Sequence, residues 1–149
     1  MYTIVRTTSE NEHFRELVNE LDKDLAIRDG DDHAFYAQFN KIDSLQQVVV
    51  LYEGTEAIGC GAIKEYDTGT AEVKRMFVAP THRNKGYASA VLKELENMAR
   101  QLGYTKCILE TGIKQPEAIS LYQKNAYAVI PNYGQYEGVT DSICFCKTL

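Results

Sequence analysis

The residues best suited to chemistry lie where an apolar strand runs through a turn into a long amphipathic helix. Residues 76–90 read MFVAPTHRNKGYASA and contain the pattern Arg-x-x-Gly-x-Ala from Arg83 to Ala88. A turn of this kind points free backbone N–H groups and the positive end of a helix dipole at one spot. Gly86 and Ala88 are small enough for a phosphate oxygen to approach the main chain, and Arg83 can donate a charge-assisted hydrogen bond. The segment predicts a pyrophosphate-binding turn.

Two common phosphate-binding motifs are absent from the sequence. No run matches the Walker A pattern Gly-x-x-x-x-Gly-Lys-Ser/Thr, and Gly86 stands alone where the dinucleotide fingerprint requires three glycines. A lone glycine near the start of a helix also fits an ordinary strand–helix connection. The surrounding pattern must therefore decide between the two interpretations.

That pattern resembles the GNAT superfamily of acetyl-CoA-dependent N-acetyltransferases. The apolar turn Phe77-Val78-Ala79-Pro80, followed by 83–88, matches the family's phosphate loop. A second family segment, a short helix of the form Ala-x-x-Leu-Tyr-x-x-x-Gly-Phe, corresponds to 118–127. The resemblance extends from about Val48 to the C-terminus and departs from the family at Ala126-Tyr127, where a Gly-Phe pair is usual.

The resemblance implies where acetyl-CoA binds. The pantetheine arm would pair with the backbone of Met76, Phe77 and Val78, and a main-chain N–H near Phe77 or Val78 would polarise the thioester carbonyl. The pyrophosphate would lie on the loop formed by Arg83, Asn84, Lys85, Gly86, Tyr87 and Ala88. Gln115 stands where the family often has an asparagine that contacts the pantetheine arm.

The resemblance also implies two catalytic side chains. Glu72 lies 11 residues before Arg83, the spacing at which several family members carry a glutamate that takes the amine proton through water. A carboxylate is a weak base for an ammonium group, so a raised pKa or a water relay is needed. Glu110 is the second candidate, and a salt-bridged strand glutamate is the alternative for Glu72. Tyr122 matches the family tyrosine near the coenzyme sulfur, while the alternative is a tyrosine that packs on the core.

The acceptor site is only weakly predicted. By analogy with the family it is formed by 25–40 and 132–138, with Asp29 (beside Asp31 and Asp32) holding a cation and Tyr133 and Tyr136 binding an amine. These residues do not separate a polyamine, an amino acid, an antibiotic or a protein N-terminus. The short N-terminal half favours a small-molecule acceptor.

Bulk properties limit the function further. The 149 residues predict a single domain, 1–149, with an ordinary composition of 44% hydrophobic and 25% charged residues. The net charge of −5 is concentrated between Ser9 and Asp32, where nine acids meet three bases, and this acidity disfavours nucleic acid. We expect no membrane segment, a cytoplasmic location, no metal and a possible homodimer through 143–145. The four cysteines predict buried thiols, because no histidine lies near them in sequence and no zinc spacing is present.

The predicted elements form a mixed α/β fold. Strands are expected at 2–8, 47–52, 56–66, 70–78, 107–110, 127–130 and 142–147, and helices at 84–102 and 116–124. A first helix begins after a capping box at Ser9 and Glu12 and ends near Gly30, and 32–40 is a helix or an ordered loop. The resulting sheet, mixed and mostly antiparallel with helices on both faces, is also the GNAT acyl-CoA N-acyltransferase fold.

Three functions fit these features. The first is transfer of an acetyl group from acetyl-CoA to an amine by direct attack in a ternary complex. The alternatives are transfer of another acyl group or to a hydroxyl, and an acyl-CoA-binding sensor without catalysis. Glu72 and Tyr122 favour the enzyme, because a sensor has no use for a base and an acid. A nucleotide-binding regulatory domain lacks the expected ribose-binding acid.

Overall fold

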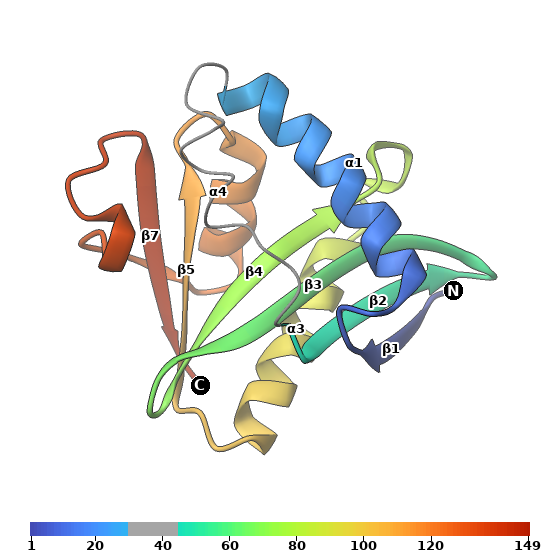
Figure 1. The fold of residues 1–149 in the computed structure, drawn as a ribbon, viewed down its shortest axis with the longest axis horizontal. Coiled ribbons are helices and arrows are strands. Elements are labelled where there is room, and N and C mark those ends of the chain that lie inside the picture. The colour runs from blue at the N-terminus through green and yellow to red at the C-terminus, as the bar shows by residue number, and fades with distance from the viewer. Residues whose placement is uncertain (30–44) are drawn as a thin grey trace.

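A computed structural model describes residues 1–29 and 45–149, except the side chains of Arg28 and Asp29 (Figure 1). The predicted element at 32–40 lies outside the described residues. In chain order the elements are β1 Thr3–Thr7, α1 Glu12–Asp29, β2 Gln47–Glu53, β3 Glu56–Asp67, β4 Thr70–Val78, a 3₁₀ turn Pro80–His82, α3 Tyr87–Gln101, β5 Lys106–Gly112, α4 Pro116–Lys124, β6 Ala128–Ile130, a 3₁₀ turn Gly134–Tyr136 and β7 Ser142–Thr148.

The described strands form a seven-stranded sheet in the order β1-β2-β3-β4-β5-β7-β6. Only β4 and β5 run parallel, and the other neighbours are antiparallel. The mixed, mostly antiparallel sheet predicted from the sequence is confirmed. β7 lies between β5 and β6, and Phe145 is fully buried within the chain while Ile143 is half-buried, so an interface through 143–145 stays a prediction. A homodimer itself stays a prediction.

Helices cover both faces of the sheet (Figure 1). On one face α1 packs Phe14, Leu17, Val18 and Leu21 against residues of β2 and β3 such as Val48 and Cys60. On the other face α3 and α4 share a core with Val49, Val73 and Phe145. Successive side chains of a strand point to opposite faces of the sheet, and they therefore contribute to two separate cores, one under each layer of helices.

A β-bulge interrupts β4 next to Gly61 of β3. Cys60 pairs with Phe77 and Ala62 with Lys74, so two residues, Arg75 and Met76, oppose the single Gly61. Arg75 has a φ of 61°, in the left-handed region that is uncommon for residues other than glycine. A Cβ on Gly61 would lie 2.7 Å from Met76 Sδ and 2.8 Å from Leu95 Cδ1 of α3, so the glycine makes room for the Met76 side chain and for the packing of α3.

Two predicted helix starts differ from the structure. The cap of α1 is Asn11, whose Oδ1 accepts the Phe14 N–H at 2.9 Å, and not Ser9, whose own N–H bonds to Leu45 O at 3.0 Å. Helix α3 begins at Tyr87 and not at Asn84, because Asn84 and Gly86 both have positive φ. The predicted bounds of β4 and α4 are confirmed.

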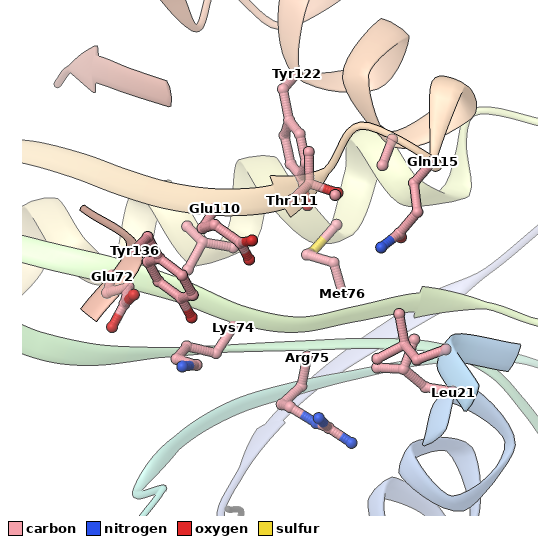
Figure 2. A pocket seen from close by; sticks show the side chains of 14 residues that line it. Leu21, Glu72, Lys74, Arg75, Met76, Glu110, Thr111, Gln115, Tyr122 and Tyr136 are labelled. Carbon is pink, nitrogen blue, oxygen red and sulfur yellow. The ribbon is translucent and has the colours of Figure 1, made fainter. Parts of the chain in front are cut away.

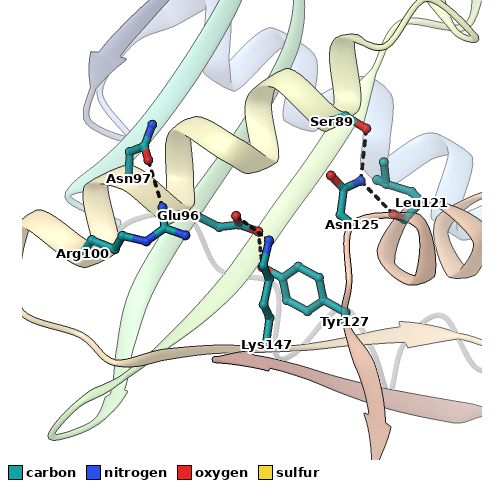
Figure 3. Close-up of polar contacts among 8 residues, drawn as sticks. All are labelled: Ser89, Glu96, Asn97, Arg100, Leu121, Asn125, Tyr127 and Lys147. Atoms are coloured by element: carbon teal, nitrogen blue, oxygen red, sulfur yellow. Dashed lines mark hydrogen bonds and ion pairs between the residues drawn. The ribbon is translucent and has the colours of Figure 1, made fainter. Parts of the chain in front are cut away.

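Polar contacts fix α3 to the elements around it (Figure 3). Glu96, 2% exposed, accepts hydrogen bonds from Tyr127 Oη at 3.0 Å and from Lys147 Nζ at 2.9 Å. Asn125 Nδ2 donates to Ser89 Oγ at 3.1 Å and to Leu121 O at 2.9 Å. The first turn of α3 is thereby tied to the end of α4.

Candidate active site

The sheet opens where the parallel strands β4 and β5 separate. Their ladder covers Thr70 to Glu72 on β4 and Lys106 to Ile108 on β5. Beyond Glu72, β4 continues to Val78 while pairing only with β3. A cavity lies at this opening (Figure 2), lined by Leu21, Leu25, Glu72, Val73, Lys74, Arg75, Met76, Glu110, Thr111, Gly112, Gln115, Ala118, Tyr122 and Tyr136.

The cavity draws residues from both faces of the sheet. In Figure 2, Tyr122 and Gln115 come from the α4 side of β4, whereas Glu72, Lys74 and Arg75 lie on the side of α1. The opening therefore connects the two faces. A donor held on one side and an acceptor held on the other can meet between the strands.

Glu72 is held by a tyrosine from the loop before β7. It is 3% exposed, and its Oε2 accepts a hydrogen bond from Tyr133 Oη at 2.6 Å. The Tyr133 ring packs edge-on against Tyr66 and Tyr136, with centroids 5.1 Å and 5.6 Å away. Burial, followed by the nearby Glu72 charge, raises the pKa of Tyr133, so its hydroxyl remains a donor.

Tyr136 is the other aromatic residue predicted for the acceptor. It is 4% exposed and lines the cavity. Burial raises its pKa, and the charges of Glu110 and Glu72 act in the same direction. Asp29 ends α1, and its side chain, like Asp31 and Asp32, lies outside the described residues. Of the two predicted acceptor residues whose side chains the structure describes, Tyr136 lines the cavity and Tyr133 bonds to Glu72, which lines it.

Tyr122 is a core residue that also borders the cavity. Its ring packs against Tyr127 and Phe145, at centroid distances of 5.8 Å and 5.9 Å, and 6% of the residue is exposed. Burial raises its pKa, and the Glu110 charge adds to the effect. The two interpretations made from the sequence are thus compatible, since the ring packs in the core while the residue borders the opening.

The predicted phosphate loop has the backbone that the sequence requires. Gly86 caps α3 with φ 82° and ψ 6°, and a Cβ there would meet nothing within 4 Å. The first helical bond runs from Ala90 N–H to Gly86 O at 3.1 Å, which leaves the amides of Tyr87, Ala88 and Ser89 without helical acceptors. The open space next to these amides suits an anion.

Two side chains of the loop hold its shape. Arg83 Nε donates to Val78 O at 2.8 Å, and its guanidinium lies 5.4 Å from the centroid of the Phe77 ring. The Tyr87 hydroxyl donates to Glu53, and this hydrogen bond lowers the pKa of Glu53. Both contacts fasten the loop to the strands that flank it.

Lys74 and Arg75 line the cavity and bring positive charge into it. Neither residue was predicted from the sequence to belong to the site. Burial lowers the pKa of Lys74, whereas the charges of Glu72 and Glu110 oppose that shift. The bulge places Arg75 on the same side of β4 as Lys74 (Figure 2). In a regular strand, neighbouring residues such as Lys74 and Arg75 point to opposite faces of the sheet. The bulge puts both on one face, and no pattern in the sequence predicts a bulge at this position.

The cysteines are not arranged for nucleophilic chemistry. Cys60, Cys107 and Cys144 are buried free thiols, and Cys146 is half-buried. Burial raises the pKa of Cys60 to about 12 and of Cys107 and Cys144 to about 11. Within residues 1–29 and 45–149, no group of three His, Cys, Asp or Glu side chains is placed to hold a metal ion. None of the helices described there is long and apolar enough to cross a membrane.

Comparisons with known proteins identify the class. The model of the Acetyltransferase (GNAT) family matches residues 11–127. An IAA acetyltransferase of Azospirillum brasilense is 34% identical over 142 residues, covering 90% of this chain and 89% of its own. The chain therefore belongs to the GNAT family and is an acetyl-CoA-dependent acyltransferase.

Solved structures share the fold. A crystal structure from Klebsiella pneumoniae, provisionally named an acyl-CoA N-acyltransferase, superposes with a TM-score of 0.85 and 29% identity over 100% of this chain and 98% of the other. A GNAT acetyltransferase of Elizabethkingia anophelis with acetyl-CoA bound has a TM-score of 0.71 and 21% identity, over 99% and 98% of the two chains. The predicted family and fold are confirmed.

Proposed function

We propose that this enzyme transfers an acetyl group from acetyl-CoA to the amine of a small molecule by direct attack in a ternary complex. The observation that carries the proposal is the opening between β4 and β5. From Glu72, where the ladder with β5 ends, β4 continues to Val78 without a partner on the β5 side among the described residues, and Val78 leads into the turn at 83–88.

The donor half of the site rests on the backbone. The pyrophosphate binds at 83–88, where the amides of Tyr87, Ala88 and Ser89 lack helical acceptors. The pantetheine arm extends along β4 from Val78 towards Met76, where β4 has no partner strand on the β5 side among the described residues. Gln115, the residue before α4, borders the same opening and contacts the arm.

The acceptor half supplies the base. An ammonium group has no lone pair, so the amine must lose a proton before it attacks the thioester carbonyl. Glu72 takes that proton, directly or through a water, while Tyr133 holds the carboxylate in place. Glu110, which lines the same cavity on β5, is the second candidate for this role.

The leaving thiolate of coenzyme A needs a proton when the acetyl group is transferred. The amine nitrogen forms a bond to the acetyl carbon, the carbon–sulfur bond breaks, and the thiolate takes that proton. Tyr122 supplies this proton, because it borders the cavity and its hydroxyl is protonated at neutral pH, and the phenolate then regains a proton from water. A main-chain N–H near Phe77 or Val78 polarises the carbonyl during the attack.

A covalent acetyl-enzyme is the competing mechanism. It needs a thiolate, and the burial of Cys60, Cys107 and Cys144 keeps these thiols protonated near neutral pH. The burial of these three thiols therefore favours direct attack.

The proposal is tested by release of free coenzyme A from acetyl-CoA, read with a thiol reagent against polyamines, amino acids, aminoglycosides and short peptides. Release that depends on an amine, with intersecting initial-velocity lines and no acetylated protein by mass spectrometry, supports direct attack. Parallel lines with an acetylated cysteine would overturn it. Propionyl-CoA, run in parallel, tests the alternative of another acyl group.

A further inference from the structure

The cavity contains a buried guanidinium that the proposed chemistry does not use. The Arg75 side chain is only 1% exposed, although it is charged and lines the opening. Its backbone adopts the left-handed conformation of the bulge opposite Gly61. A bulge commonly redirects a side chain next to a functional site, at a cost in backbone strain.

Most of the hydrogen-bonding capacity of this guanidinium is unused. Arg75 Nη2 donates to Asp22 Oδ1 of α1 at 2.5 Å. Its Nε and Nη1 atoms are buried and have no hydrogen-bond partner in the part of the chain that the structure describes. A buried donor without an acceptor is costly, and more so when it belongs to a charged group. An acceptor oxygen supplied by a ligand would satisfy these donors.

The charges around the cavity favour one class of acceptor. Glu72 and Glu110 provide two carboxylates, and Lys74 and Arg75 provide two basic groups, of which Arg75 is paired through Nη2 with Asp22 of α1. The additional positive charges of a polyamine or an aminoglycoside would find no use for the remaining guanidinium donors. An acceptor with one amine and one carboxylate offers a partner to both the acidic and the basic groups.

We propose that the acceptor is a small amino carboxylic acid whose carboxylate binds the Arg75 guanidinium while its amine faces Glu72. This inference rests on the proposed function and adds the class of acceptor to it. A guanidinium is suited to the task, because its planar donors match the geometry of a carboxylate. Residues 72 and 75 lie three positions apart on β4, and both side chains lie on the α1 side of the strand (Figure 2), an arrangement that suits an amine reached through a water or carried on a short stem.

The test compares amines that differ only in the carboxylate. The pairs are lysine and 1,5-diaminopentane, phenylalanine and phenethylamine, and 6-aminohexanoate and hexylamine. Each is assayed as acceptor with saturating acetyl-CoA. We expect kcat/KM for the carboxylate member of at least one pair to exceed that of its partner by about tenfold or more, as for one charge-assisted hydrogen bond.

Two variants assign the preference to Arg75. Arg75→Gln should abolish it by lowering kcat/KM for the carboxylate member alone, and Arg75→Lys should keep part of it. Asp22→Asn is the matched control, because it removes the same ion pair but leaves the guanidinium, and it should keep the preference. The melting temperature and the Kd of acetyl-CoA show whether each variant is folded.

The outcomes separate this inference from the proposed function. If the amines without a carboxylate are acetylated equally well, the assignment of Arg75 is overturned while the transferase reaction stands. If no acceptor of any class is acetylated, the proposed function fails. The inference is then decided by calorimetric titration of N-acetylphenylalanine and its amide into the protein saturated with coenzyme A. Tighter binding of the carboxylate that disappears in Arg75→Gln supports it, and equal binding contradicts it.

Discussion

Tyr133 Oη donates a hydrogen bond of 2.6 Å to Glu72 Oε2, across 61 residues of sequence. The contact joins the loop before β7 to β4, the strand that leads into the turn at 83–88. It fixes the Glu72 carboxylate at the point where β4 and β5 separate. The loop predicted to bind the acceptor therefore also positions the candidate base.

Glu72→Gln should lower kcat at pH 7 by about a hundredfold, the usual contribution of general base catalysis. The Kd of acetyl-CoA should be unchanged, because the phosphate loop lies at the other end of β4. Steady-state rates across pH 6–9, together with calorimetry for the coenzyme, test both expectations. Glu110→Gln is the comparison variant, and a larger loss there would transfer the role of base to Glu110.

Tyr133→Phe should weaken the site without removing the base. The change deletes one hydroxyl and leaves the buried Glu72 carboxylate short of a donor, at a cost of about 1–3 kcal/mol in stability. We expect a reduced kcat and a lower urea midpoint. Tyr66→Phe is the matched control, since it keeps the neighbouring ring and alters a residue that is 41% exposed. Equal effects of the two variants would argue against the specific role of the Tyr133 hydroxyl.

Gly86→Ala and Gly103→Ala separate backbone strain from ligand binding. Both glycines have positive φ, 82° and 92°, and at both a Cβ would meet nothing within 4 Å. Each variant should lose about 1 kcal/mol of stability from the left-handed conformation. Only Gly86→Ala should weaken the binding of acetyl-CoA, because its methyl group projects next to the amides of Tyr87, Ala88 and Ser89, which have no helical acceptors. Calorimetry that finds equal affinities for both variants would refute the placement of the pyrophosphate.

The buried thiols predict a loss of stability at high pH. The folded-state pKa of Cys60 is about 12 against an ordinary 9.0, so the unfolded chain ionises first and the contribution of Cys60 disappears as pH rises from about 9 to 12. At pH 10 this amounts to about 1 kcal/mol. Urea midpoints at pH 8 and pH 10 should differ less in Cys60→Ala than in the parent protein. An unchanged difference would show that Cys60 is not the source.

Local signals in the sequence predict much of the fold. The turn at Gly69 precedes β4 and Pro80 follows it, and Pro116 marks the first residue of α4. The predicted start of α3 fails by three residues, because a helical apolar pattern cannot show that Asn84 and Gly86 adopt positive φ. The predicted cap at Ser9 is wrong because the chain makes a further turn, with the Asn11 N–H bonded to Thr8 O, before Asn11 caps the helix.

The site is less predictable than the fold, because long-range contacts assemble it. Glu72 was identified through its distance from Arg83, but its bond to Tyr133 depends on how the loop before β7 folds back over β4. Nothing in the sequence indicates that Arg75 lines the cavity, since a regular strand would place its side chain on the opposite face from Lys74. A one-residue irregularity therefore determines the charge of the cavity.

The ion pair of Glu96 and Lys147, 2.9 Å long, should contribute more to stability than a shorter ion pair on the surface. Glu96 is buried, with its oxygens bonded to Lys147 and Tyr127, so Lys147→Met leaves a carboxylate with one neutral donor. Removing one partner of a buried pair costs about 3–5 kcal/mol, and the 22% exposure of the Lys147 side chain reduces our expectation to about 2 kcal/mol. Arg6→Met breaks the exposed pair with Glu94, 2.6 Å long, and should cost less than about 1 kcal/mol.

In urea unfolding, adding Glu96→Gln to Lys147→Met should recover part of the lost stability, because the buried charge of Glu96 is then absent. If the double variant is as unstable as Lys147→Met alone, the loss comes from packing around the lysine stem and the carboxylate is not its cause.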